Sequence, residues 1–258
     1  MVIIPIHLLP HYAKLKLTDT VFGFPTAPDL PLEGHNLGFL DQRLGLDWVQ
    51  RNIRAFGGDP TKVTLFGESA GAYSIDILLT SYPANSNPPF RAAILQSGQV
   101  SYNNPYVADT TASWYALAAA LNCTDSQNNL TCIREAPATT IKEILEHQAL
   151  NFYPVRDNIT WIENAAQARI SGNIANIPVL SGTNAQESRV LTIGQTNATA
   201  YLLSIGVPEE MIQAIEVAYP IGGWEFPTPY DAIAQMATDF AFHCVSSGNI
   251  RFALEFLT

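Results

Sequence analysis

The pentapeptide Gly67-Glu68-Ser69-Ala70-Gly71 has the G-x-S-x-G spacing that surrounds a nucleophilic serine in many hydrolases. Apolar residues 63–66 before it predict a buried strand, and residues 70–79 after it predict a helix. The chain must then turn sharply at Ser69, between the strand and the helix. This turn would expose the serine hydroxyl, and the two glycines would leave room for a strained backbone. The N–H of Ala70 would donate to an oxyanion at the positive end of the helix. We therefore expect Ser69 to be a nucleophile, although a bare pentapeptide of this kind also occurs by chance as a turn.

Alternating strands and helices surround this motif. Leu37, Leu40, Leu44, Trp48 and Ile53 follow helical spacing, with Asp41, Arg43 and Asp47 elsewhere around the turn, and Gly57, Gly58 and Pro60 should end that helix. Short apolar stretches at 92–96 and 177–182 predict two further strands, and helices are expected near 111–121, 139–149 and 160–171. This order indicates an α/β fold with a mostly parallel sheet covered by helices on both faces.

The chain of 258 residues is expected to form a single domain, residues 1–258, in which residues 1–20 fit poorly with the rest. Residues 1–9 could form a short buried strand, but Pro5 and Pro10 weaken that interpretation. The same stretch lacks the basic start and the cleavage site of a signal peptide.

Composition narrows the class of partner. The net charge is −10, which argues against nucleic acid and anionic membrane surfaces because both would repel the protein. No apolar run approaches the ~20 residues of a transmembrane helix. The charged fraction of 14% and the hydrophobic fraction of 47% are those of a globular protein.

Sequons and cysteines point outside the cell. Asn122, Asn129, Asn158 and Asn197 each begin an N-x-S/T glycosylation sequon. Cys123 and Cys132 flank a polar, turn-rich segment that could let them meet in a disulfide, and two free thiols in a cytosolic protein are the alternative. Cys244 is the third cysteine, and an odd cysteine in a secreted protein suggests a missing partner.

Five stretches of the sequence share a pattern with known proteins: Asn36–Arg43, Trp48–Ile53, Phe56–Pro60, Val63–Gly71 and Ala93–Gly98. Together they resemble the type-B carboxylesterase/lipase family, which includes carboxylesterases, cholinesterases and extracellular fungal-type lipases. The resemblance runs from about Phe22 to the C-terminus. It implies a partial α/β-hydrolase fold, without the first strands and the C-terminal histidine segment. It also implies hydrolysis of a small-molecule or lipid carboxylic ester through an acyl-serine on Ser69, with neither a metal nor an organic cofactor.

The resemblance also suggests the acid that accompanies the nucleophile. Glu187 falls on the family's acidic position, although Gln186 and Ser188 depart from the usual neighbours. Without the resemblance, Glu187 would be read as an ordinary surface carboxylate. Ser74 resembles a position that hydrogen-bonds behind the acid, and the Cys123–Cys132 pair fits a short disulfide loop of the family.

The base histidine is expected to lie outside this chain. The chain has five histidines, and only His243 follows Glu187. Its surroundings resemble a helix that comes before the family's histidine segment. A His-Gly-Gly loop, which would supply further oxyanion donors, does not precede Ser69. We therefore expect the chain as written to be impaired or inactive. The alternative is a catalytically dead relative acting as a binding or adhesion-type protein, although such proteins usually replace the nucleophile.

Overall fold

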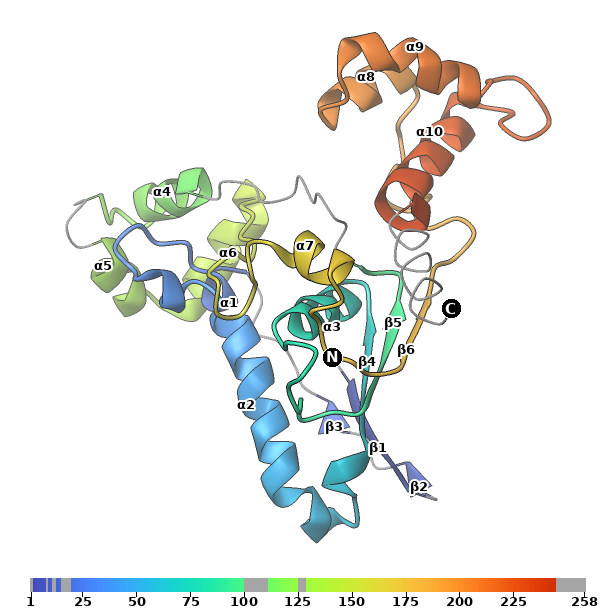
Figure 1. The fold of residues 1–258 in the computed structure, drawn as a ribbon. Coiled ribbons are helices and arrows are strands. Elements are labelled where there is room, and N and C mark those ends of the chain that lie inside the picture. Colours follow the sequence, from blue (N-terminus) through green and yellow to red (C-terminus); the bar gives the residue numbers. More distant parts are fainter. Residues whose placement is uncertain are drawn as a thin grey trace.

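A six-stranded sheet forms the centre of the protein (Figure 1). The computed structural model describes residues 20–99, 111–124 and 129–244, and the backbone of residues 2–7, 9–10 and 13–14. The strands are β1 (Val2–His7), β2 (Leu9–Pro10), β3 (Ala13–Lys14), β4 (Val63–Glu68), β5 (Ala92–Gln96) and β6 (Val179–Gly182). Their order is β2-β1-β4-β5-β6, with β3 paired to β1. The predicted strands at 63–66 and 92–96 are confirmed, and the third is shorter than predicted.

The helices account for most of the remaining described chain. They are α1 (Thr20–Gly23), α2 (Leu37–Asn52), α3 (Ala70–Thr80), α4 (Thr111–Ala120), α5 (Asn129–Glu135), α6 (Ala138–Gln148), α7 (Ala165–Ile170), α8 (Ala198–Ser204), α9 (Glu209–Ala218) and α10 (Pro229–Thr238). Short helical turns are η1 (Leu32–Gly34), η2 (Ile53–Phe56), η3 (Pro60–Lys62) and the π-helical turn η4 (Asp239–His243). The helices predicted near 111–121 and 139–149 are confirmed, and the one predicted over 160–171 begins only at Ala165.

Parallel pairing joins β4, β5 and β6, whereas β1 runs antiparallel to β4. Pro5 lies within β1, opposite Val63, so the two prolines that weakened the expected strand do not prevent it. The parallel strands bring their carboxyl ends to one edge of the sheet, where residues 69, 97 and 183 follow. This edge is where the candidate site is built.

One face of the sheet packs against both α2 and α3. Val63 and Leu65 of β4 and Ala93 and Leu95 of β5 alternate onto this face and are almost fully buried. Side chains of α2 and α3 complete the cluster, among them Leu46, Val49, Ile75, Leu78 and Leu79. Because these two helices contact the same face, burial of apolar surface fixes α3, and with it the turn that precedes α3.

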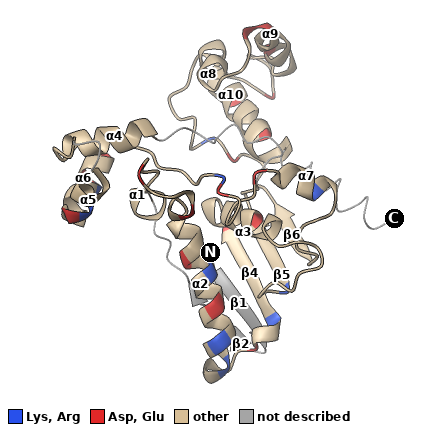
Figure 2. Ribbon diagram, turned by 60° about the vertical axis from the view of Figure 1, so that its left-hand side comes forward, with Lys and Arg blue, Asp and Glu red and all other residues tan. Residues whose placement is uncertain are grey.

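The apolar stripe identified on α2 in the sequence is not the side of the helix that is buried. Four of its five members, Leu37, Leu40, Leu44 and Trp48, are exposed, and only Ile53 is buried. The buried side instead carries Gly38, Phe39, Gln42, Leu46 and Val49. Charges of both signs alternate along the helix (Figure 2). Two apolar stripes therefore coexist on α2, and spacing alone did not identify the one that packs on the sheet.

Two further apolar clusters lie away from the sheet. One joins α1, α4, α5 and α6 and includes Trp114 and Trp161, and the other joins α8, α9 and α10. In Figure 1 the latter three helices gather at one end of the molecule, and α10 leads back towards the sheet. No helix in the described part of the chain is long and apolar enough to cross a membrane.

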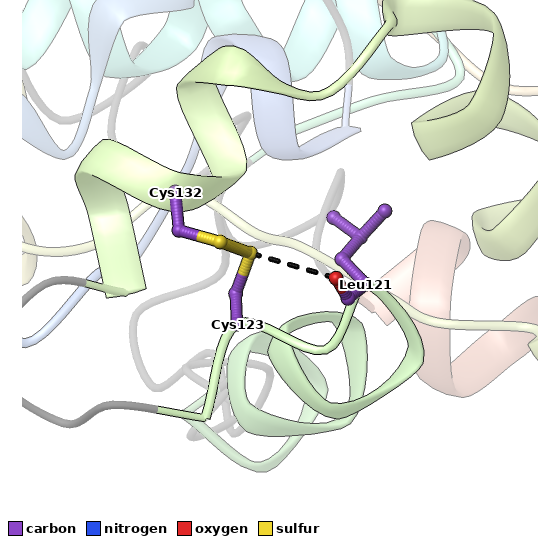
Figure 3. Close-up of a disulfide and its surroundings, with 3 residues drawn as sticks. All are labelled: Leu121, Cys123 and Cys132. Atoms are coloured by element: carbon purple, nitrogen blue, oxygen red, sulfur yellow. Dashed lines mark hydrogen bonds between the residues drawn. A yellow bond between two sulfur atoms is a disulfide. The ribbon is translucent and has the colours of Figure 1, made fainter.

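A disulfide joins Cys123 and Cys132 within the first of these clusters (Figure 3). The Cα atoms are 5.7 Å apart, and Cys132 lies on α5, so part of the segment read as a loop is helical. Cys244 is exposed and forms no disulfide with any described residue.

A buried ion pair fixes α7 against α3. The Arg169 guanidinium contacts the Asp76 carboxylate, and the side chains are only 9% and 1% exposed. Removing one partner of such a pair leaves an uncompensated charge in the interior, which is costlier than losing the attraction itself.

We predict that Asp76→Ala lowers the free energy of unfolding by about 3–5 kcal/mol, because Arg169 stays buried without its counter-charge. Urea unfolding followed by circular dichroism measures the change. Glu146→Ala, which breaks the exposed Lys142–Glu146 pair on α6, is the matched control and should change the value by less than about 1 kcal/mol. Equal effects of the two substitutions would contradict the role assigned to the buried pair.

Candidate active site

Ser69 occupies a strained turn between β4 and α3. Its backbone has φ 51° and ψ −122°, a left-handed φ that non-glycine residues rarely adopt. β4 ends at Glu68 and α3 begins at Ala70, so a single residue makes the change of direction. A Cβ added to Gly67 would overlap the backbone of Gly71, so the first glycine is required for the close approach of strand and helix. The Ser69 side chain is exposed at the edge of the sheet, as predicted.

The end of β5 holds this turn in place. The Ser69 N–H donates to the Gln96 carbonyl oxygen at 2.9 Å, and the Ser69 carbonyl accepts from the Tyr73 N–H at 2.9 Å. A Cβ on Gly98 would overlap the Ser69 carbonyl oxygen and contact the Ala72 side chain. In the sequence Gly98 was only the last residue of the stretch Ala93–Gly98, so its contact with the turn was missed.

Ala70 is placed to donate a hydrogen bond beside the Ser69 hydroxyl. It is the first residue of α3, so its N–H has no acceptor within the helix, and it is exposed. The N-terminus of an α-helix also carries a partial positive charge. An oxyanion forming near Ser69 would therefore find one preorganised donor here.

Glu187 lies in the segment that follows β6, and Asn184 holds its carboxylate. The Asn184 N–H donates to Oε1 at 2.5 Å, and the Asn184 side-chain amide donates to Oε2 at 3.2 Å. Burial raises the pKa of Glu187, but hydrogen bonds from the Ser97 side chain and from Asn184, with the charge of His243, bring it below its ordinary value. Glu187 is thus held as a carboxylate rather than left as an ordinary surface acid.

Ser97, and not Ser74, is the serine that contacts the acid. Ser74 Oγ donates to the Ala70 carbonyl at 2.8 Å within α3, so the role inferred for Ser74 was wrong. The Ser97 side chain bonds Glu187, and the Asn184 amide reaches Ser97 Oγ at 3.3 Å. Ser97 directly follows β5, the strand between β4 and β6, so its contact comes from the order of the strands and had no local signal in the sequence.

Two of the three described histidines, His35 and His243, form hydrogen bonds with groups other than Ser69. His35 Nε2 contacts the Leu30 carbonyl at 3.2 Å, and His147 is exposed on α6. His243 lies in η4, within a helical segment as predicted, and both its ring nitrogens have partners. His7 and His11 have side chains outside the described residues.

A hollow of about 370 Å³ lies beside these groups, at the ends of the parallel strands. Its lining includes Glu68, which precedes Ser69, and Ser97 and Asn184, which contact Glu187, together with Leu180 and Thr183. Within the described residues, no group of three or more His, Cys, Asp or Glu side chains could hold a metal ion.

The four sequon asparagines differ in accessibility. Asn122, Asn158 and Asn197 are exposed, whereas Asn129 is only 4% exposed at the start of α5. A glycan needs an amide at the surface, so the structure disfavours Asn129 as an acceptor and leaves the other three available.

Comparisons with known proteins place this geometry in a family. Residues 20–206 match the family model described as "Carboxylesterase family". The chain is 39% identical to "Secreted lipase 5" of Gibberella zeae over 65% of its length and 34% of that protein's, and 35% identical to "Chlorogenic acid esterase" of Aspergillus niger over 63% and 32%. It is also similar to "Acetylcholinesterase" of Electrophorus electricus, with 34% identity over 78% of this chain and 33% of that protein.

A solved structure agrees with these sequence matches. The crystal structure of Aspergillus niger EstA superposes with a TM-score of 0.78 and 23% identity, covering 92% of this chain and 50% of that one. The chain belongs to the carboxylesterase family, and its fold is that of the α/β-hydrolases, as the resemblance implied. It spans about a third of the length of the curated relatives that it matches.

We predict that Gly98→Ala destabilises the protein by about 1–3 kcal/mol, because the added methyl group must displace the Ser69 carbonyl. Urea unfolding measures the loss, and amide hydrogen exchange should show faster exchange of the Ser69 N–H, which is bonded to Gln96. Gly182→Ala is the matched control, since a Cβ there would meet nothing within 4 Å. An unchanged stability and an unchanged Ser69 exchange rate in Gly98→Ala would contradict the contact.

Proposed function

We propose that this chain carries the nucleophile and the acid of a carboxylic ester hydrolase. Ser69 Oγ attacks the ester carbonyl carbon while a histidine base takes its proton, and the tetrahedral oxyanion accepts from the Ala70 N–H. The carbon–oxygen bond to the alcohol breaks, and the alcohol leaves with the proton that the base returns. Water then hydrolyses the acyl-serine and releases the acid. The strained turn at Ser69, joined through the end of β5 to the Glu187 carboxylate, is the observation that carries the proposal.

The base in this proposal is a histidine from outside the chain, and Glu187 orients it and stabilises its charged form. Among the described histidines, His243 has both ring nitrogens bonded to other groups. A serine without its base is a weak nucleophile at neutral pH, and loss of a triad member lowers turnover by about 10⁴–10⁶. Residues 1–258 alone should therefore turn over esters very slowly.

The names of the relatives support a substrate class, and the disulfide and the sequons support a location. Their names include secreted lipases and a chlorogenic acid esterase, which supports a small-molecule or lipid carboxylic ester as substrate. The Cys123–Cys132 disulfide and the three exposed sequons support an extracellular protein, because disulfides persist in oxidising compartments. The adhesion-type alternative gains no support, since the nucleophile and its turn are intact.

We predict that short-chain p-nitrophenyl esters acylate Ser69 only when imidazole is added as an external base. The expected result is negligible turnover without imidazole, and with it an acyl adduct that peptide mass spectrometry locates on Ser69. Ser69→Ala, assayed at the same imidazole concentration, measures the background hydrolysis by imidazole itself and should carry no adduct.

Two results would contradict the proposal in different ways. Rapid hydrolysis without imidazole that Ser69→Ala abolishes would show that the chain supplies its own base. Absence of an adduct on Ser69 in every condition, while the protein is folded by circular dichroism, would show that Ser69 is not a nucleophile.

A further inference from the structure

His243 joins the C-terminal end of α10 to the segment that carries the acid. Its Nε2 contacts the Asn184 carbonyl oxygen at 2.9 Å, and its Nδ1 contacts Asp239 Oδ1 at 2.7 Å. A carbonyl oxygen and a carboxylate both accept hydrogen bonds, so each ring nitrogen must carry a proton to donate. The geometry is therefore that of an imidazolium, with one N–H directed to each element.

Asp239 is itself held by side chains from two helices. Tyr219, which follows α9, donates its hydroxyl to Oδ2 at 2.8 Å, and Gln235 of α10 donates its amide to Oδ1 at 2.9 Å. With His243, the Asp239 carboxylate thus accepts three hydrogen bonds. Asp239 and His243 begin and end the π-helical turn η4, a rare geometry that is frequent at functional sites.

Helix α10 also contacts the chain just beyond Glu187. The Ser188 N–H donates to Thr238 Oγ1 at 2.9 Å, and Arg189 pairs with Asp231 of α10. Tyr230 of α10 donates its hydroxyl to the Arg189 carbonyl at 2.6 Å. Contacts from α10 and η4 therefore flank Glu187 on both sides, at Asn184 and at residues 188–189.

We propose that His243 is a positioning residue for Glu187, acting through Asn184. The imidazolium holds the Asn184 carbonyl, and the backbone and side-chain amides of that same Asn184 hold both oxygens of the Glu187 carboxylate. The role assigned here goes beyond catalysis by Ser69, because it concerns how the segment after β6 is fixed whatever the source of the base. It rests on the proposed function only in naming Glu187 as the acid.

The contact should depend on pH through the charge of His243. The Asn184 carbonyl raises the pKa of His243, burial lowers it, and the hydrogen bond and charge of Asp239 and the charge of Glu187 raise it, with a net increase. Asp239 and Glu187 are the charged residues that raise the pKa of the ring, and Tyr219 and Gln235 bond Asp239. Because the folded pKa lies above the unfolded value of about 6.5, the stabilisation is complete below that pH and is lost as pH rises through the folded pKa.

We predict that His243→Leu lowers the melting temperature by about 2–4 °C below pH 6, the effect of a lost charge-assisted hydrogen bond, and by less near pH 9. His243→Gln keeps an amide donor without the charge, so its melting temperature at low pH should lie between those of the unaltered protein and His243→Leu. In both variants the pKa of Glu187, measured by carbon-detected NMR, should rise because the nearby positive charge is gone. His147→Gln, which replaces an exposed histidine on α6, is the matched control and should change neither quantity.

The proposal has outcomes that would overturn it. If His243→Leu lowers the melting temperature equally at all pH values, His243 contributes by packing and not by its charge. If the pKa of Glu187 is unchanged in the variants, His243 does not act on Glu187. Should the variants fail to fold, NMR titration of His243 in the unaltered protein decides, and a pKa at or below the ordinary value would contradict the proposal. None of these measurements needs turnover, so failure of the ester-hydrolysis test would leave them interpretable.

Discussion

The close approach of the end of β5 to the Ser69 turn is the constraint on which the candidate site depends. Gly98 lies against the Ser69 carbonyl, and Gln96 accepts the Ser69 N–H, so two residues at the end of β5 support a backbone that would otherwise relax from its left-handed φ. Burial of α2 and α3 on one face of the sheet holds the other side of the turn. Strain at Ser69 is thus maintained by packing and backbone hydrogen bonds rather than by any single strong interaction.

Glu187 is fixed by a different kind of interaction, a polar network between separate elements. Ser97, which follows β5, bonds Glu187, and Asn184 bonds both carboxylate oxygens. On either side of Glu187, η4 contacts Asn184 and α10 contacts Ser188. Ser97 links the two halves of the candidate site, because it follows Gln96, which bonds the Ser69 turn, and itself bonds Glu187. The order of the parallel strands makes this possible, since β5 lies between β4 and β6.

The turn at Ser69 could be predicted from the sequence because its determinants are local: an apolar strand, two glycines and a helix within a few residues. Glu187 needed the family resemblance, since nothing local distinguishes it from a surface carboxylate. Ser97 and Gly98 were missed because their roles come from which strands are neighbours, and the apolar spacing on α2 identified the exposed stripe because both sides of that helix carry apolar residues. Residues 1–9 were ambiguous because Pro5 disfavours a strand locally, while pairing with β4 stabilises one.

One measurement tests whether the end of β5 joins the Ser69 turn to Glu187. It is the pKa of the Glu187 carboxyl group, determined by carbon-detected NMR titration in the unaltered protein and in Ser97→Ala. We predict a pKa below the ordinary glutamate value in the unaltered protein and a higher one in Ser97→Ala, because the hydroxyl donor is removed while Asn184 remains. Equal values in the two proteins would show that Ser97 does not hold the acid and would contradict the link.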